Sequence, residues 1–299
     1  MKISNIWRIN LKPSAEENID PREFCLSNGC VGVGWGIGSR VQPTWEEYEN
    51  EAKVIYPEDR GWWPALNVIK HRMFENDICW TRDSRGVYYI GRITGSWEYK
   101  FTDEYQKADI INTRKCEWLK VGNEDAVPGK VVNSFMPSRT VQAIDDNAVR
   151  LFSVMYYNQK SSLPEKYRIE RREIDLFSLL SSEDCEDLVA IYMQLQGYLL
   201  LPSTCKKSTM AHEFIMNHRE NNKKASAQVK KGNVDLDINE YKGRFSETFL
   251  FTTNGNYLGD AAKDVICISK KEMLQFIDKN YQVLPERIKT WIQFKNKSM

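Results

Sequence analysis

Three stretches of sequence decide the fold of the second half of this 299-residue chain: CEDLVAIYMQLQGYLLLP at 185–202, HEFIM at 212–216 and ASAQVKKG at 225–232. The first has apolar residues at helical spacing, and the other two are expected to form strands. Gln228 and Lys230 are two positions apart, so on a strand their side chains leave the same face. A neighbouring strand that carries Glu213 can therefore place its carboxylate beside them.

The elements around these stretches follow from capping and periodicity. Ser181 and Asp184 have the spacing of a capping box that begins a helix, and Gly197 ends it. We expect its buried stripe to consist of Leu188, Ile191, Tyr192 and Leu195. Strands are expected at 198–201, 212–217, 225–230, 248–253 and 265–268, and further helices at 236–243, 271–280 and 285–294.

This order of elements, with an acid on the second strand and Gln-Val-Lys on the third, resembles the PD-(D/E)XK nuclease superfamily. It is more narrowly similar to the Mrr-type restriction endonucleases, which use a Q-x-K version of the last motif. The resemblance covers roughly residues 181–291. It implies a mixed sheet flanked by helices and a metal-dependent endonuclease that hydrolyses phosphodiester bonds in DNA.

The resemblance also implies roles for individual residues. Mg²⁺, or Mn²⁺ in its place, takes oxygen ligands and keeps several waters. Glu213 would supply a carboxylate, Gln228 its amide oxygen and Val229 its backbone carbonyl. Lys230 would orient or deprotonate the attacking water and stabilise charge on the phosphate. Glu186 would support a second metal or a metal-bound water.

Each of these assignments has a structural alternative. Glu213 can be a solvent-facing residue, and Gln228 with Lys230 can be the polar face of an amphipathic strand. Glu186 can be an exposed carboxylate favoured by the helix dipole. The usual Asp of the second strand is here Glu213, which is one methylene longer and puts full activity in doubt. The basic runs Lys206-Lys207 and 218–224 can neutralise phosphates or be ordinary solvated loops.

The first half of the chain predicts short strands, two small helices and a compact barrel. The strands are expected at 3–9, 30–35, 77–82, 87–94 and 116–121, and the helices at 44–56 and 64–75. In the second helix, Leu66, Ile69 and Phe74 would lie on one side. Residues 83–86 read as a hairpin turn.

The segments 73–101, 114–119 and 127–132 resemble a PUA/EVE-like module of the kind attached to restriction nucleases, over about residues 3–144. Such barrels often bind nucleic acid, and several accept a modified base flipped out of the duplex. Trp35, Trp97 and Tyr99 are the aromatic candidates for stacking on such a base. The alternative is that the tryptophans are core residues. The stretch GVGWG at 32–36 lacks the lysine and Ser/Thr of a phosphate-binding loop.

Composition limits the other possibilities. Eight of the nine tryptophans lie in the first 118 residues, which favours two distinct domains. The net charge is +1, with −2 in residues 1–150 and +3 in the rest, so contacts with DNA must come from local patches. The seven cysteines form no CxxC pair and are expected to be reduced and packed. Neither a signal peptide nor a membrane span is evident, which predicts a cytoplasmic protein.

We therefore expect a two-domain α+β or α/β chain: a PUA/EVE-like reader at 1–145, a linker region at 146–175 and a nuclease domain at 176–299. The polar stretch 158–164 is the best candidate for the connection. The expected function is modification-dependent restriction or antiviral defence, and a homodimer would supply two active centres. The alternatives are a nucleic-acid-binding protein with a decayed nuclease domain and a nuclease effector whose N-terminal pocket senses a small nucleotide.

Overall fold

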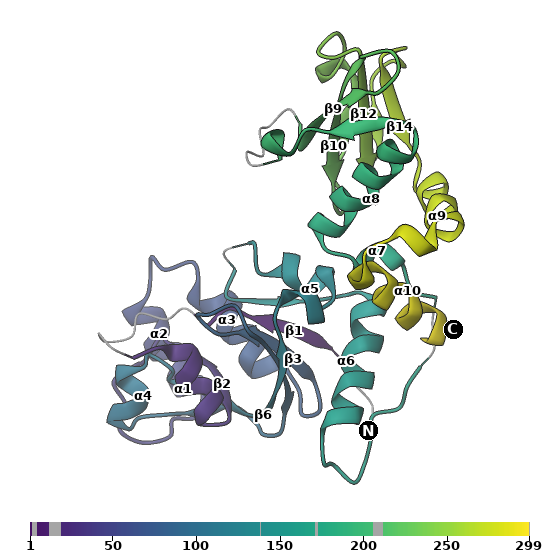
Figure 1. Ribbon diagram of the computed structural model, residues 1–299. Coiled ribbons are helices and arrows are strands. Elements are labelled where there is room, and N and C mark those ends of the chain that lie inside the picture. The colour runs from purple at the N-terminus through teal and green to yellow at the C-terminus, as the bar shows by residue number, and fades with distance from the viewer. Residues whose placement is uncertain (2–4, 12–18, 138, 171–172, 206–211, 299) are drawn as a thin grey trace. The chain divides into compact units, whose positions relative to one another are not determined.

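A computed structural model describes residues 1, 5–11, 19–137, 139–170, 173–205 and 212–298. The chain divides into two compact units, Met1–Ser178 and Leu179–Lys297. Each unit contains its own β-sheet with helices, so the fold is α+β, as the sequence predicts. The two units are described separately below (Figure 1).

The first unit is built on a seven-stranded, strongly curled half-barrel sheet of order β2-β6-β4-β3-β1-β7, with β5 paired to β6. Its strands are β1 (Ile6–Ile9), β2 (Cys30–Val33), β3 (Ile78–Arg82), β4 (Tyr88–Ile93), β5 (Glu98–Tyr99), β6 (Asn112–Gly122) and β7 (Val141–Ala143). The long strand β6 pairs with β2 and β5 through its first part and with β4 through the rest. This shared strand lets the sheet curl, and the five strands that the sequence predicts are all present.

Both faces of this sheet are covered by apolar side chains. On β1, Trp7 and Ile9 belong to one core cluster, whereas Ile6 belongs to the cluster on the other side. This division follows from the alternation of side chains along a strand. The hairpin turn at 83–86 is confirmed, since Asp83 accepts hydrogen bonds from the backbone N–H groups of Arg85 and Val87, both at 2.9 Å.

The helices of the first unit are α1 (Pro21–Ser27), α2 (Trp45–Ile55), α3 (Trp62–Asn67), α4 (Asp103–Lys107), α5 (Gly129–Ser134), α6 (Asn147–Lys160) and α7 (Leu176–Leu179), the last ending at the boundary. The predicted helix at 44–56 is confirmed as α2, capped by Thr44. The helix predicted at 64–75 is confirmed up to Arg72, as α3 followed by a π-helical turn, Val68–Arg72. The prediction is wrong for Phe74, which lies outside the helix and is 53% exposed.

Much of the stretch 146–175, which was expected as a linker region, is part of the first unit. Asp146 caps α6 through bonds to the N–H groups of Ala148 and Val149, and α6 buries Val149, Val154 and Tyr157 in the core. The signal for this helix was present in the sequence as an N-cap aspartate followed by apolar residues at helical spacing.

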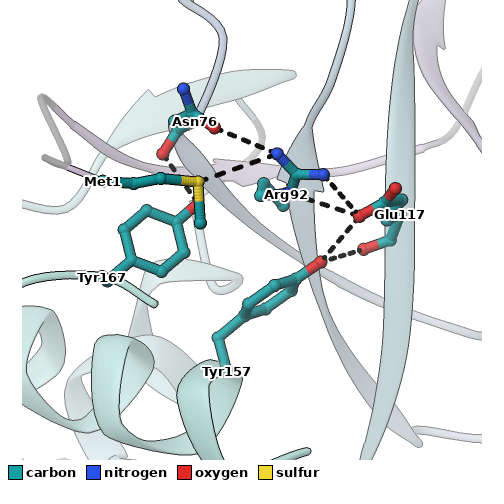
Figure 2. A network of polar contacts seen from close by, with 6 residues as sticks. All are labelled: Met1, Asn76, Arg92, Glu117, Tyr157 and Tyr167. Carbon is teal, nitrogen blue, oxygen red and sulfur yellow. Dashed lines mark hydrogen bonds and ion pairs between the residues drawn. The ribbon is translucent and has the colours of Figure 1, made fainter. Parts of the chain in front are cut away.

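A network of polar contacts fastens α6 and the segment after it to the sheet (Figure 2). Arg92 of β4 donates to Glu117 of β6 at 2.8 Å, and the Tyr157 hydroxyl donates to the Glu117 backbone oxygen at 3.3 Å. Tyr167 donates to the backbone oxygen of Asn76 at 2.9 Å. Burial is the first cause of the raised pKa of Tyr157. The network therefore makes the segment up to Tyr167 an integral part of this unit.

The second unit contains a five-stranded mixed sheet of order β14-β12-β10-β9-β8. Its strands are β8 (Tyr198–Leu200), β9 (Phe214–His218), β10 (Lys224–Lys230), β12 (Glu247–Thr252) and β14 (Val265–Ile268). The central strand β10 runs antiparallel to β9 and parallel to β12. A central position explains why β10 is almost fully buried, from Ala225 to Val229.

Helices α8 (Ser182–Leu195), α9 (Lys270–Lys279) and α10 (Glu286–Ser298) complete the second unit. The capping box of Ser181 and Asp184 is confirmed, and Gly197 has a φ of +96° just beyond the end of α8. The predicted stripe of α8 is partly wrong. Leu188 is buried, but Leu195 is 54% exposed, because the helix packs on β10 through a face that includes Val189 and Met193.

The helix predicted at 236–243 is wrong. The chain forms β11 (Leu236–Asp237), which pairs with β13 (Tyr257–Leu258), and then one 3₁₀ turn, Ile238–Glu240. The Asp237 side chain accepts a hydrogen bond from the N–H of Asn239 at 2.9 Å. This bond caps the start of the 3₁₀ turn.

Candidate functional site

The structure brings together Glu213, Gln228 and Lys230, which the sequence places in one site. Gln228 and Lys230 lie on the same face of β10. Glu213 directly precedes β9, and its N–H donates to the backbone oxygen of Ala227 at 2.8 Å. This bond ties Glu213 to β10, where its side chain contacts Gln228 and Lys230.

One oxygen of Glu213 is the meeting point of the three side chains. Gln228 Nε2 donates to Glu213 Oε1 at 2.8 Å, and Lys230 Nζ donates to the same oxygen at 3.2 Å. The Glu213 side chain is 8% exposed and that of Lys230 is 38% exposed. The arrangement is a buried carboxylate and amide with a cation at the solvent side, so the interpretation of Glu213 as a solvent-facing residue does not hold.

The amide oxygen of Gln228 is an unusual feature of this cluster. It is buried, and no hydrogen-bond donor among the described residues reaches it. A buried polar atom without a partner has a free-energy cost of about 1–3 kcal/mol. If the oxygen and nitrogen of the Gln228 amide exchanged places, the oxygen would face the Glu213 carboxylate. Two such acceptors repel one another unless a cation lies between them. The oxygen is thus available as a ligand.

Val229 separates these two side chains along β10 and is buried. Its carbonyl lies on the same edge of β10 as the Ala227 carbonyl, since backbone groups alternate along a strand. That is the edge at which Ala227 accepts the bond from Glu213.

The charges of this cluster affect the pKa of Glu186, a residue of α8. Its pKa is raised to about 7, first by burial and then by the negative charge of Glu213, while Lys230 acts in the opposite direction. Two carboxylates that repel one another in a partly buried place form a favourable environment for a hard cation. The interpretation of Glu186 as a simple solvated carboxylate of a first helical turn is therefore insufficient.

These groups fit a magnesium ion. Within the described part of the chain, no three His, Cys, Asp or Glu side chains are grouped so that they could hold a metal. Mg²⁺ does not require such a group, because it is often held by one or two carboxylates and keeps its waters. The unpartnered oxygen of Gln228 is an oxygen ligand. The raised pKa of Glu186 reflects burial first and then the negative charge of Glu213.

We expect Glu186→Gln to stabilise the protein above pH 7 when a chelator is present. A carboxyl whose pKa is raised on folding binds more protons in the native state, so stability falls as pH rises from the unfolded value of 4.5 to about 7. Glutamine does not titrate and so removes this loss of stability. With solvent screening taken into account, the free energy of unfolding should rise by about 1–2 kcal/mol at pH 8 and little at pH 5.

Thermal unfolding at both pH values measures the effect. The matched control is Glu240→Gln, a change of an exposed acid in the same unit. An equal gain at pH 5 and pH 8 would show that Glu186 does not titrate as stated.

Only one of the two basic runs lies within the described residues. Lys206 and Lys207 lie outside the described residues. The run at 218–224 forms the turn at the other end of β10, six residues from Lys230, which is about 20 Å on an extended strand. Lys223 forms an ion pair with Glu247 at 2.7 Å. This turn therefore does not neutralise a phosphate held at Lys230.

The first unit contains a cavity of about 360 Å³ beside Trp35. Trp35 is half-buried, has a φ of +60° and donates from Nε1 to Asp59 Oδ2 at 2.7 Å. The remaining lining residues are Asn10, Leu11, Gly32, Val33, Gly34, Tyr56, Asp109 and Thr140. An aromatic wall with carboxylates and backbone groups suits a planar ligand that carries hydrogen-bond donors.

Trp97 and Tyr99 are not walls of this cavity, contrary to expectation. Trp97 is 7% exposed, and its Nε1 donates to Asn112 Oδ1 at 3.1 Å. Tyr99 is 2% exposed, and its hydroxyl accepts a bond from the N–H of Ile37 at 3.0 Å. Both side chains belong to the apolar core of the half-barrel.

The two carboxylates of the cavity have no counterpart among the residues that the sequence pattern singles out. Asp59 follows α2, and Asp109 follows α4 with a φ of +50°. A Cβ added to Gly34 would lie 2.3 Å from Asp109 Oδ1, so this glycine admits a carboxylate rather than a ligand. The sequence alone does not show that Asp109 contacts Gly34, because the two residues are 75 positions apart.

Comparisons with known proteins are sparse. Residues 7–145 match a family model described as a domain of unknown function (DUF8426). No curated protein matches the chain. Among solved structures, there is a distant resemblance to the DNA modification-dependent restriction endonuclease AspBHI, with a TM-score of 0.22 and 10% identity over 91% of this chain and 80% of that one. The described part of the chain contains no helix with the length and apolar character needed to cross a bilayer.

Proposed function

We propose that this protein is a Mg²⁺-dependent DNA endonuclease. The observation that carries the proposal is the convergence of Gln228 and Lys230 on one buried oxygen of Glu213. A merely amphipathic strand has no reason to bury a carboxylate together with an amide whose oxygen has no partner. Such an arrangement has a cost in stability, and functional sites are where such costs are commonly found.

The chain's own residues have distinct tasks in hydrolysis of a phosphodiester. Lys230 holds a positive charge at the solvent side of the cluster, where it stabilises charge on the phosphate and orients the attacking water. Glu213 fixes the Lys230 ammonium and the Gln228 amide through one oxygen. Glu186, with a pKa near 7, can accept a proton at neutral pH.

Glu213, Gln228 and the Val229 carbonyl would hold Mg²⁺, or Mn²⁺ in its place, with Glu186 as a further oxygen donor through water. The ion supplies Lewis-acid activation of the phosphate and of water. Cutting both strands would take two such centres, which a homodimer would provide.

We propose further that the first unit selects the DNA by accepting a modified base in the cavity beside Trp35. A ring stacked on Trp35 would present its edge to Asp59 and Asp109, which accept hydrogen bonds from exocyclic N–H groups. On this proposal the protein acts in restriction of modified DNA, including that of viruses.

A cleavage assay tests the proposed function. Plasmid DNA with and without cytosine modification is incubated with the full chain in Mg²⁺ or in a chelator. We expect nicked or linear product in Mg²⁺ alone, and more of it from modified DNA. Binding without cleavage in Mg²⁺ and in Mn²⁺ would instead mean a nucleic-acid-binding protein with a decayed nuclease. Cleavage triggered by an added nucleotide, regardless of modification, would mean a nucleotide-sensing effector.

A further inference from the structure

A second hollow of about 800 Å³ lies in the first unit and has no role in the account above. We call it the arginine groove after Arg60, Arg72 and Arg139, which all line it and are exposed. Its other lining residues are Trp7, Gly61, Pro64, Ala65, Asn67, Val68, Thr140, Val141, Gln142 and Ala143. The groove thus runs from the region of α3 to strand β7.

The charge of the groove is uncompensated. None of its lining residues is an aspartate or a glutamate. The guanidinium of Arg72 lies over the Trp7 ring, 5.7 Å from its centroid. Within the described residues, no ion pair engages Arg60, Arg72 or Arg139. Three arginines that line one groove without an acid form a site for an anion, because a guanidinium matches the oxygens of a phosphate.

Another arginine, Arg8, hydrogen-bonds to β7 and to the residues before it, which form one wall of the groove. Arg8 is fully buried and donates to the backbone oxygens of Arg139 and Thr140 and, at 2.9 Å, to Gln142 Oε1. Burial is the main cause of its lowered pKa, to which the charges of Arg139 and Arg82 contribute. The positive charge of the groove therefore extends beneath its surface, and the segment that carries Arg139 is anchored.

The arginine groove adjoins the cavity beside Trp35. Thr140 lines both hollows. Asp59 lines the cavity, and the next residue, Arg60, lines the groove. The acidic cavity suits a neutral ring that carries hydrogen-bond donors, and the groove suits an anion. The two hollows therefore match the base and the phosphate of a nucleotide within a strand.

We propose that the arginine groove binds the phosphodiester backbone of the DNA strand whose base enters the cavity beside Trp35. This inference rests on the proposed function for the identity of the ligand. Backbone contacts of this kind position a strand without reading its sequence, whereas the cavity does the reading. The groove thereby supplies the local basic patch that the net charge of +1 does not reveal.

The test is the salt dependence of DNA binding by the full chain. The probe is a fluorescent 20-base-pair duplex in a chelator, which prevents cleavage. The variant combines Arg60→Gln, Arg72→Gln and Arg139→Gln. Each phosphate contact contributes about 0.9 to the slope of log K against log salt, so we expect the slope to fall by about 2–3 and the affinity at 0.1 M salt to fall about tenfold or more.

A matched control removes the same charge from elsewhere on the first unit. It combines three exposed lysines that line neither hollow: Lys107→Gln, Lys120→Gln and Lys130→Gln. The proposal is supported if the control keeps the steep slope of log K against log salt and the groove variant loses it. Equal slopes in all three proteins, or equal losses in both variants, overturn it.

The outcome is separable from that of the proposed function. Thermal unfolding of both variants first establishes that they are folded. Cleavage by the wild-type chain together with an unchanged slope in the groove variant overturns the groove alone. A wild-type chain that neither binds nor cuts the duplex overturns both.

Discussion

Replacement of Lys230 by alanine is expected to lower the single-turnover rate of DNA cleavage about 100- to 1,000-fold. The Lys230 ammonium is the cation at the solvent side of the cluster, 3.2 Å from Glu213 Oε1. Loss of a group that stabilises charge in the transition state has an effect of about this size. Binding of DNA in a chelator should change little, because the interaction matters mainly in the transition state.

Lys231→Ala is the matched control for this variant. Lys231 is the next residue, and its ammonium donates to the backbone oxygen of Leu180 rather than to Glu213. Its removal should leave the cleavage rate within about threefold of the wild type, as expected of a residue that takes no part in the reaction. If Lys230→Ala cleaves as fast as Lys231→Ala, Lys230 has no part in the chemistry.

The second large effect concerns stability. Trp97→Ala should destabilise the first unit by about 3–5 kcal/mol, because it removes a buried indole that packs at a centroid distance of 5.4 Å on Trp45 and donates to Asn112. Trp35→Ala should cost less stability, since Trp35 is only half-buried. It should instead weaken binding of modified DNA about 5- to 150-fold through the loss of a stacking surface.

Thermal unfolding and binding, measured on the same two variants, separate the two roles. The account fails for Trp35 if its variant unfolds as early as that of Trp97 while the folded fraction binds modified DNA normally. It fails for Trp97 if that variant keeps its unfolding temperature.

The sequence was most informative where local rules and tertiary packing agree. Ser181 and Asp184 form the expected capping box, and the two-residue spacing of Gln228 and Lys230 places both on one face of a buried strand. Glu213 could be placed beside them because the strands on either side of a short connection pair directly. These inferences need only the geometry of a helix end and a strand.

Predictions failed where side chains in other elements decide the outcome. Leu195 fits the period of α8 but is exposed, because the helix packs through a face that includes Val189 and Met193. The helix expected at 236–243 gives way to a short strand that needs its partner β13, some twenty residues later. Trp97 was a candidate wall by composition, and only the packing on Trp45 places it in the core.

The arginine groove and the two carboxylates of the cavity beside Trp35 had no signal in the sequence. Arg60, Arg72 and Arg139 come from three separate segments, and neither spacing nor net charge groups them. Asp59 follows α2 and Asp109 follows α4, and both line the same cavity as Trp35. Sites assembled from distant segments require the fold before they can be seen.

The rate of DNA cleavage by Glu213→Gln as a function of Mg²⁺ tests the central claim most directly. Glutamine keeps the shape of the side chain but removes the charge on which Gln228 and Lys230 converge. The account predicts that the wild type and the control Glu240→Gln, which changes an exposed acid of the same unit, cleave with a saturable dependence on Mg²⁺. It predicts that Glu213→Gln stays at the background rate at every concentration. Equal Mg²⁺ dependence and equal rates in all three proteins would contradict the account.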